Sequence, residues 1–415
     1  MNQASYGKAL IKRLSALVIT IGASQMIILS QISLISEYCG LSVAELGMLV
    51  AIGTACIMFA GPYWGQRIDR LGAKPVLRFG LITSLLANVV FVGVILLLGL
   101  QRLDPSLGFA ILICSRIVNG IGAAGIYPSC QSWGVSHTPP EQRMKVLSSL
   151  SAAVNIGRVI GPLLALPTLA LLSLLKQFPP SLQLTTLLWI LILPLFGLWA
   201  LGGLQGQAVN TDDSKESTAK EPFAVTPYLL FFLAACCTIT VSQLQVLLGP
   251  VLEDFYHLSA LAASKGSAAL LVAIAVVAAT IQLTVVRRIR SARFGLILGG
   301  SLLTVGLICM QALLGGWGAL PGLLLIVAGI TLMIPAYTSL ISASAGTKQG
   351  RIFGQLSMVH TGGFTIGFGL GSWLYTHVHS FPLIGLLSSA ALLIVVLLIC
   401  LQSKLTAEGA TQEVN

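Results

Sequence analysis

The sequence predicts an all-α membrane protein in which twelve transmembrane helices form two pseudo-symmetric six-helix bundles. Three observations predict this fold class: the apolar composition, the number of long apolar segments and one hydrophilic stretch at mid-chain. Of the 415 residues, 56% are hydrophobic and 9% are charged, whereas soluble proteins carry about 25% charged residues. So few ionisable side chains cannot cover a globular surface of this size, which excludes a water-soluble enzyme.

Twelve segments are long and apolar enough to cross the hydrocarbon layer, which takes about 20 residues of helix. A backbone in lipid has to satisfy its polar groups within its own segment, so these segments are predicted to be helices. They cover approximately residues 14–36, 46–64, 76–99, 108–134, 146–174, 183–204, 227–250, 266–286, 294–315, 320–343, 352–375 and 382–402.

The net charge of +10 is explained by its distribution over the two sides of the membrane. Most lysine and arginine residues fall in the segments that lie on the same side as the N-terminus. Cytoplasmic loops carry an excess of these residues, so we expect both termini in the cytoplasm. The charge therefore indicates a multi-pass topology and needs no nucleic-acid partner.

A hydrophilic stretch interrupts the chain at residues 205–226 and reads as a flexible linker. It separates an N-terminal six-helix bundle, 1–204, from a C-terminal bundle with a short cytoplasmic tail, 227–415. Equal halves indicate two parallel repeats related by an axis normal to the membrane, with a substrate site between them.

The segment Gly65–Lys74 reads GQRIDRLGAK and is predicted to form the loop after the second span. An aspartate at a helix end can face the positive N-terminus of a neighbouring helix, while an adjacent arginine pairs with an acid. Such a contact can exist in one conformational state and be absent from another. The alternative is an ordinary basic cytoplasmic loop.

The fourth span carries RIVNGIGAA, from Arg116 to Ala124. An arginine inside a membrane is costly and is therefore a functional candidate. The alternative is a structural arginine that bonds to carbonyl groups of the first helix.

The fifth span carries GRVIGP, from Gly157 to Pro162. The glycines Gly157 and Gly161 lie one turn apart and permit close helix packing, and Pro162 favours a bend. The eleventh span repeats the glycines, at Gly363 and Gly367, without the proline. Generic helix packing is the alternative explanation.

These three motifs resemble signatures of the major facilitator superfamily, and in particular of its twelve-helix drug/proton antiporters. The resemblance implies the major facilitator fold and a secondary transporter of the bacterial inner membrane that works by alternating access. It further implies a conformational latch on the cytoplasmic side and a coupling role for Arg116. The implied latch residues are Gly65, Asp69, Arg70, Gly72 and Lys74.

The resemblance implies a cavity lined mainly by the first, fourth, seventh and tenth helices, with help from the second, fifth, eighth and eleventh. Their polar residues are the candidates for substrate contact: Gln25, Gln31, Asn119, Tyr127, Asn155, Arg158, Gln245 and Tyr337. All thirteen acidic residues lie in loops or at span ends, whereas Arg116 and Arg158 lie within spans. We therefore expect an anionic or zwitterionic amphiphile, such as a siderophore, or drugs; packing of Arg158 against helix ends or headgroups is the alternative.

The candidates for proton coupling are Arg116, His360 and Glu37, because an imidazole titrates near neutral pH and Glu37 lies at the external mouth. The expected driving force is the proton gradient, without a cofactor. We expect a monomer in contact with membrane lipid, with no catalytic residues and no metal site, since His377 and His379 lack a third ligand. A metabolite importer and an uncoupled facilitator remain the alternatives.

Overall fold

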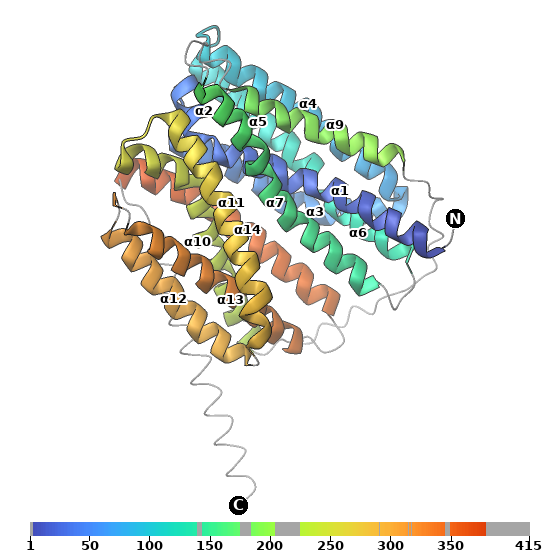
Figure 1. The fold of residues 1–415 in the computed structure, drawn as a ribbon. Helices are drawn as coiled ribbons and strands as arrows, with labels where there is room; N and C mark the ends of the chain where they lie inside the picture. The colour runs from blue at the N-terminus through green and yellow to red at the C-terminus, as the bar shows by residue number, and fades with distance from the viewer. Residues whose placement is uncertain are drawn as a thin grey trace, which may run out of the picture. The chain divides into compact units, whose positions relative to one another are not determined.

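The computed structural model describes residues 3–138, 143–174, 184–203, 225–289, 291–313, 315–316, 318–344 and 349–378. Helices joined by short turns account for almost all of these residues (Figure 1). The α-helices are α1 Gln3–Ser30, α2 Ile32–Cys39, α3 Val43–Leu71, α4 Ala73–Gly99, α5 Pro105–Ala123, α6 Ile126–Ser136, α7 Arg143–Leu174, α9 Trp189–Gly202, α10 Val225–Tyr256, α11 Ala260–Thr284, α12 Ala292–Ala312, α13 Ala319–Ser344 and α14 Gln349–Val378. Two 3-10 segments, η2 Leu184–Leu188 and η3 Val286–Arg288, complete the described elements.

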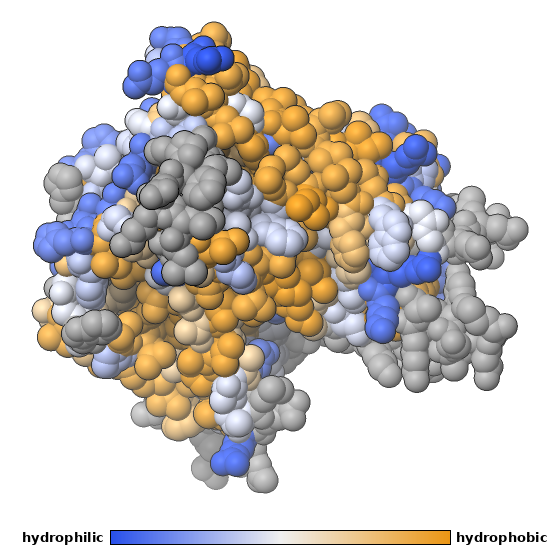
Figure 2. Space-filling model, turned by 45° about the horizontal axis from the view of Figure 1, so that its top comes forward, coloured by the Kyte–Doolittle hydropathy of each residue, from blue (hydrophilic) through white to orange (hydrophobic). Residues whose placement is uncertain are grey.

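Ten spans among the described residues are long and apolar enough to cross a membrane. They correspond to the first ten predicted spans, and the all-α fold class is confirmed. The predicted eleventh span is the 30-residue α14, and the predicted twelfth, 382–402, lies outside the described residues. Apolar side chains form a broad area on the visible face in Figure 2. Large apolar side chains of the described residues are exposed as well, among them Trp199 and Phe59, which are 75% and 72% exposed, as expected for surfaces solvated by lipid.

The contacts divide the chain into two compact units. The first comprises Met1–Glu216 and Leu248–Val272, and the second comprises Ser217–Leu247 and Ala273–Asn415. The predicted linker, 205–226, falls almost entirely outside the described residues, so the division into two bundles at that point stays a prediction.

In the first unit, α1 and α7 touch backbone to backbone through glycine. A Cβ on Gly161 would lie 2.5 Å from the carbonyl oxygen of Ala23, and one on Gly22 would lie 2.6 Å from that of Val154. A Cβ on Gly157 would likewise collide with the carbonyl of Ile19. Small residues let membrane helices approach closely and gain van der Waals contact, which drives their association in lipid.

The helices α4 and α5 also pack closely through glycine. A Cβ on Gly80 would lie 2.7 Å from the carbonyl oxygen of Gly122. The helix α5 also meets α3, because a Cβ on Gly120 would lie 2.5 Å from the carbonyl oxygen of Gly53. The motif glycines of the fourth predicted span therefore serve helix packing.

The second unit repeats these contacts. The helices α12 and α13 meet at Gly299 and Gly329, where an added Cβ would lie 2.7 and 2.5 Å from the opposite glycine's carbonyl oxygen. The helix α14 approaches α10 at Gly367, where a Cβ would lie 2.5 Å from the carbonyl oxygen of Ile239. The pairs α12–α13 and α10–α14 hold the same places in the second half as α4–α5 and α1–α7 in the first, which supports a repeated architecture.

The α1–α7 contact gives a test of this packing. We expect Gly161→Ala to lower the thermal unfolding midpoint of the purified protein, because the added methyl group must push two backbones apart, at a cost of about 1–3 kcal/mol. The matched control is Gly93→Ala in α4, where nothing lies within 4 Å of the added Cβ. That variant should keep or raise the midpoint, since alanine favours a helix over glycine. Equal effects of the two substitutions would contradict the close packing.

Candidate functional site

A cavity of about 100 Å³ lies inside the first unit, among α1, α2, α3, α4, α5, α6 and α9. Its wall is mainly apolar, with side chains such as Ile28, Leu49 and Ile57. Polar groups come from α1, α3, α4 and α5: Thr20, Ser24, Gln25, Thr54, Ser84, Asn88, Arg116 and Asn119. The sequence-predicted residues Gln25, Arg116 and Asn119 are thus brought together at one cavity.

Arg116 is the charged group of this cavity, and it is only 5% exposed. Its Nη2 donates a hydrogen bond to Asn88 Oδ1 at 2.9 Å. Its guanidinium carbon lies 4.0 Å from the centre of the Phe91 ring, within the range of a cation–π interaction. Among the residues that the structure describes, the partners of this arginine are therefore on α4 and not among the carbonyl groups of the first helix.

Asn88 is held in turn by α9, because its Nδ2 donates to the carbonyl oxygen of Ile190 at 3.1 Å. With its amide group oriented in this way, Asn88 presents its oxygen to Arg116. One amide thus joins α4, α5 and α9 through two buried hydrogen bonds. Asn88 and Phe91 were not among the predicted site residues, although a buried asparagine in a span is itself a polar signal.

The positive charge of Arg116 has no acidic neighbour on the cavity wall, as far as the structure describes that wall. A guanidinium has five N–H donors, and in the described part of the chain this one makes a single hydrogen bond. Its Nε is buried without a hydrogen-bond partner among the same residues. Each acidic residue that the structure describes lies in the first or last turn of a helix or beside one: Glu37, Glu45, Asp69, Asp104, Glu253 and Asp254.

The other predicted contact residues of the first unit lie elsewhere. Gln31 is fully buried at the break between α1 and α2, where it donates to the carbonyl oxygen of Ile27 and accepts a hydrogen bond from Thr186. Tyr127 packs against the apolar core of α1, α4, α6, α7 and α9. On α7, Asn155 is exposed and Arg158 is half-buried, and neither is among the residues that line the cavity.

In the second unit, Tyr337 of α13 and His360 of α14 form a pair. Their hydroxyl oxygen and Nε2 lie 2.8 Å apart, and Tyr337 is fully buried. Gln245 on α10 is half-buried, and its Oε1 has no hydrogen-bond partner in the described part of the chain. The coupling candidate Glu37 of the first unit is exposed on α2.

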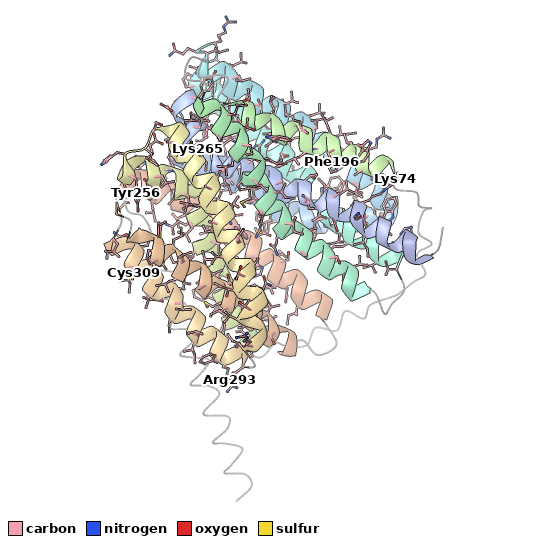
Figure 3. The ribbon with its side chains drawn as sticks, in the orientation of Figure 1. Lys74, Phe196, Tyr256, Lys265, Arg293 and Cys309 are labelled. Atoms are coloured by element: carbon pink, nitrogen blue, oxygen red, sulfur yellow. The ribbon has the colours of Figure 1, made fainter. Side chains whose placement is uncertain are left out.

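The segment Gly65–Lys74 is not the loop that the sequence predicted. The helix α3 continues to Leu71, so Gly65, Asp69 and Arg70 lie in its last two turns. Gly72 alone makes the turn into α4, with a φ of +82°, a conformation that favours glycine. Asp69, Arg70 and Lys74 are exposed. Lys74 lies toward one end of the helices of the first unit, and Lys265 of α11 lies toward the opposite end (Figure 3). A helix that extends beyond the membrane explains the error, because a charged final turn resembles a loop in sequence.

Trp64, directly before this segment, donates a hydrogen bond to a helix break in the neighbouring span. The predicted fourth span is divided into α5 and α6, and at the junction Gly125 N–H bonds to the carbonyl of Gly122 at 3.3 Å. The carbonyl oxygen of Ile121 thereby loses its usual helical donor. Trp64 Nε1 donates to it at 2.6 Å instead, which ties α3 to the α5–α6 junction.

A largely apolar cavity that lies among membrane-spanning helices and holds a buried arginine is typical of one class of protein, the membrane transporters. Residues 14–361 match the family model of the Major Facilitator Superfamily, and the chain belongs to that superfamily. It is therefore a transporter, with a small-molecule substrate, and not an enzyme.

Two efflux proteins show sequence similarity over part of the chain. The quinolone resistance protein NorA of Staphylococcus aureus is 28% identical over 123 residues, which are 30% of this chain and 29% of NorA. Multidrug resistance protein 2 of Bacillus subtilis is 30% identical over 122 residues, or 29% of this chain and 28% of that protein. The alignments thus span under a third of these relatives.

Solved structures confirm the fold over nearly the full length. A bacterial homologue of the iron transporter ferroportin, in an inward-facing state, matches with a TM-score of 0.70 and 18% identity over 96% of this chain and 98% of that one. A D-xylose–proton symporter matches with a TM-score of 0.66 and 14% identity over 93% and 97%. At these identities the likeness establishes the predicted major facilitator fold alone.

The Trp64 contact can be tested by hydrogen exchange. We expect Trp64→Phe to accelerate amide exchange at the α5–α6 junction, because it removes the hydrogen bond to the carbonyl of Ile121, which contributes about 0.5–1.5 kcal/mol. The control is Trp199→Phe, at a side chain that is 75% exposed. Unchanged exchange in the Trp64 variant would show that the indole is dispensable at the break.

Proposed function

We propose that this secondary transporter is a proton-coupled exporter of small amphiphilic molecules. The observation that carries the proposal is the largely apolar cavity with a buried cation at Arg116, in a chain related to two drug efflux proteins. Apolar walls take the body of an amphiphile, and the few polar groups orient it. The protein acts as a monomer in a bacterial inner membrane, with both termini in the cytoplasm.

The charge of the cavity decides which amphiphiles bind best. Arg116 has no acidic partner on the wall that the structure describes, so the cavity favours anionic or zwitterionic molecules over cations. Quinolones, which the relative NorA is named for resisting, include zwitterions of this kind. A siderophore has no support beyond this charge preference.

The Tyr337–His360 pair is the proton carrier in this proposal. An imidazole titrates near neutral pH, and the phenol at 2.8 Å can donate to it or accept from it as its protonation changes. The pair that would carry the proton thus lies on α13 and α14 of the second unit. The charge of the substrate is instead bound by Arg116 in the first unit. Glu37, exposed on α2, is the second candidate.

The end of α3 supplies the conformational latch. Asp69 and Arg70 are exposed in the last turn of the helix and free to reach a neighbouring helix end, and Gly72 fixes the turn that follows. Trp64 and Ile68 anchor this end of α3 in a small apolar cluster with Val76 and Ala124. Motion of the latch is thereby linked to the α5–α6 junction.

Transport into everted membrane vesicles tests the exporter function. Vesicles from a host that produces the protein should accumulate the zwitterionic quinolone norfloxacin when an inward-acid gradient is imposed, and nigericin should abolish the accumulation. Vesicles from the same host without the protein are the control. If norfloxacin only equilibrates across the vesicle membrane and nigericin has no effect, the protein is an uncoupled facilitator. If the proton gradient drives norfloxacin out of preloaded vesicles, the protein is an importer.

The proposed proton carrier gives a separate prediction. We expect His360→Gln to abolish gradient-driven accumulation of norfloxacin and to leave exchange of labelled for unlabelled norfloxacin intact, because exchange requires no net proton movement. The control is His377→Gln on the same helix, where the imidazole is exposed and contacts the carbonyl of Trp373. Proton-driven accumulation that survives in the His360 variant would exclude this residue as the carrier.

A further inference from the structure

We propose that the Arg116 cavity is a carboxylate-binding subsite, in which the guanidinium receives the anionic end of the substrate. The inference rests on the proposed function as an amphiphile exporter and names the chemical group that the cavity recognises. The body of the same molecule lies against the apolar wall formed by residues such as Ile28, Leu49 and Val50. The substrate class is therefore that of aromatic or aliphatic monocarboxylates and zwitterions.

The unused donors of Arg116 are the first argument. The planar guanidinium fork matches the two oxygens of a carboxylate and can bind them in a bidentate manner. Asn88 occupies one N–H and Phe91 covers one face of the group. The rest of the guanidinium edge has no hydrogen-bond partner in the described part of the chain, and the residue lines the cavity.

The fixed position of Arg116 is the second argument. Asn88 cannot rotate freely, because its Nδ2 is bonded to the carbonyl of Ile190. Its oxygen therefore holds the guanidinium from one side while the ring of Phe91 supports it from another. Asn88 and Phe91 are positioning residues, and they aim the charge before any ligand arrives, which lowers the ordering cost of binding.

Charge balance is the third argument. A buried cation without a counter-ion is unfavourable in a low-dielectric environment, and the ring of Phe91 compensates it only in part. No acidic side chain is among the wall residues that the structure describes. A single negative charge from the ligand completes the site, and a cationic amphiphile would be repelled.

Neutral donors on the wall of the same cavity complete the subsite. Ser24, Gln25 and Asn119 place hydroxyl and amide groups on the same wall. These groups can donate to the outer lone pairs of a bound carboxylate, and they add no second positive charge. The set fits a monovalent anion better than a dianion such as phosphate.

Equilibrium dialysis with a matched pair of probes tests the subsite. The full-length protein in lipid nanodiscs is dialysed against labelled 2-naphthoate or against 2-naphthamide, which has the same shape and no charge. We expect the carboxylate to bind about tenfold more tightly, as for a hydrogen-bonded charge in a buried site. Equal affinities for the two probes would overturn the proposal.

Two variants assign the preference to the cavity. Arg116→Gln should bind both probes equally, whereas Arg102→Gln, at an exposed arginine, should keep the preference. Because loss of a buried arginine can also disturb folding, Asn119→Asp provides a second test. It leaves Arg116 in place and supplies an internal carboxylate one helical turn away, so it should fold and yet lose the preference for naphthoate. A preference that survives in both Arg116→Gln and Asn119→Asp would overturn the assignment.

One further measurement, together with the vesicle and dialysis assays, separates the possible outcomes. Chloride at high concentration should compete weakly with naphthoate, because it gains nothing from the apolar wall; complete displacement by chloride would show an inorganic-anion site and overturn the proposal. Failure of the subsite leaves proton-driven norfloxacin accumulation intact. Failure of the exporter function instead removes accumulation in vesicles while the naphthoate preference of the purified protein persists.

Discussion

The hydrogen-bonding demand of the backbone in lipid is the constraint on which this structure depends. Lipid cannot satisfy a free carbonyl or amide group, so a departure from helical geometry needs another hydrogen-bond partner, which a side chain can provide. At the α5–α6 break that partner is Trp64, which bonds to the carbonyl of Ile121. At the α1–α2 break, Gln31 bonds to the carbonyl of Ile27 and is held by Thr186. Each break is thereby fastened to a neighbouring helix or turn.

The helices themselves associate by close backbone contact, since lipid supplies little hydrophobic driving force between them. Glycine creates this contact at Gly161 against α1 and at Gly80 against α5, and again at Gly299 and Gly367 in the second unit. At each of these points the glycine leaves room for the backbone of the neighbouring helix, and in several of them also for one of its side chains, such as Met333 at Gly299. The packing of the helices therefore depends on the absence of a Cβ at these positions.

The span positions and the packing glycines could be predicted from the sequence because each depends on local composition. Hydropathy and length define a span, and glycines one turn apart define a close helix contact. The end of α3 was wrongly predicted as a loop, because Asp69 and Arg70 carry charge although the helix continues through them. The partners of Arg116 lay beyond prediction. Asn88 is 28 residues away in sequence, and only the packing of α4 against α5 brings it and Phe91 to the guanidinium.

The prediction of cavity residues was limited in the same way, because it too depends on how the helices pack. Gln25, Gln31 and Tyr127 are all polar residues within spans, and a sequence alone cannot give the rotation of a helix about its axis. Gln25 lines the cavity, whereas Gln31 secures a helix break and Tyr127 packs in the core. A polar residue in a span thus indicates that a hydrogen bond is made there, and binding a ligand is only one of the roles that such a bond can have.

In the proposed mechanism Arg116 binds an anionic substrate and His360 carries the proton. This combination determines how much the membrane potential contributes to transport. Export of one monovalent anion moves a negative charge outward, and entry of one proton moves a positive charge inward. Both movements follow a membrane potential that is negative inside, so a one-to-one exchange moves two elementary charges in the favourable direction. At about 2.3 kcal/mol per charge for each 100 mV, the potential contributes about 4.6 kcal/mol to each cycle. The same exchange with a monovalent cation would gain nothing from the potential, because the two charge movements cancel. A carrier built around Arg116 would therefore export anions with a driving force that a carrier for cations lacks.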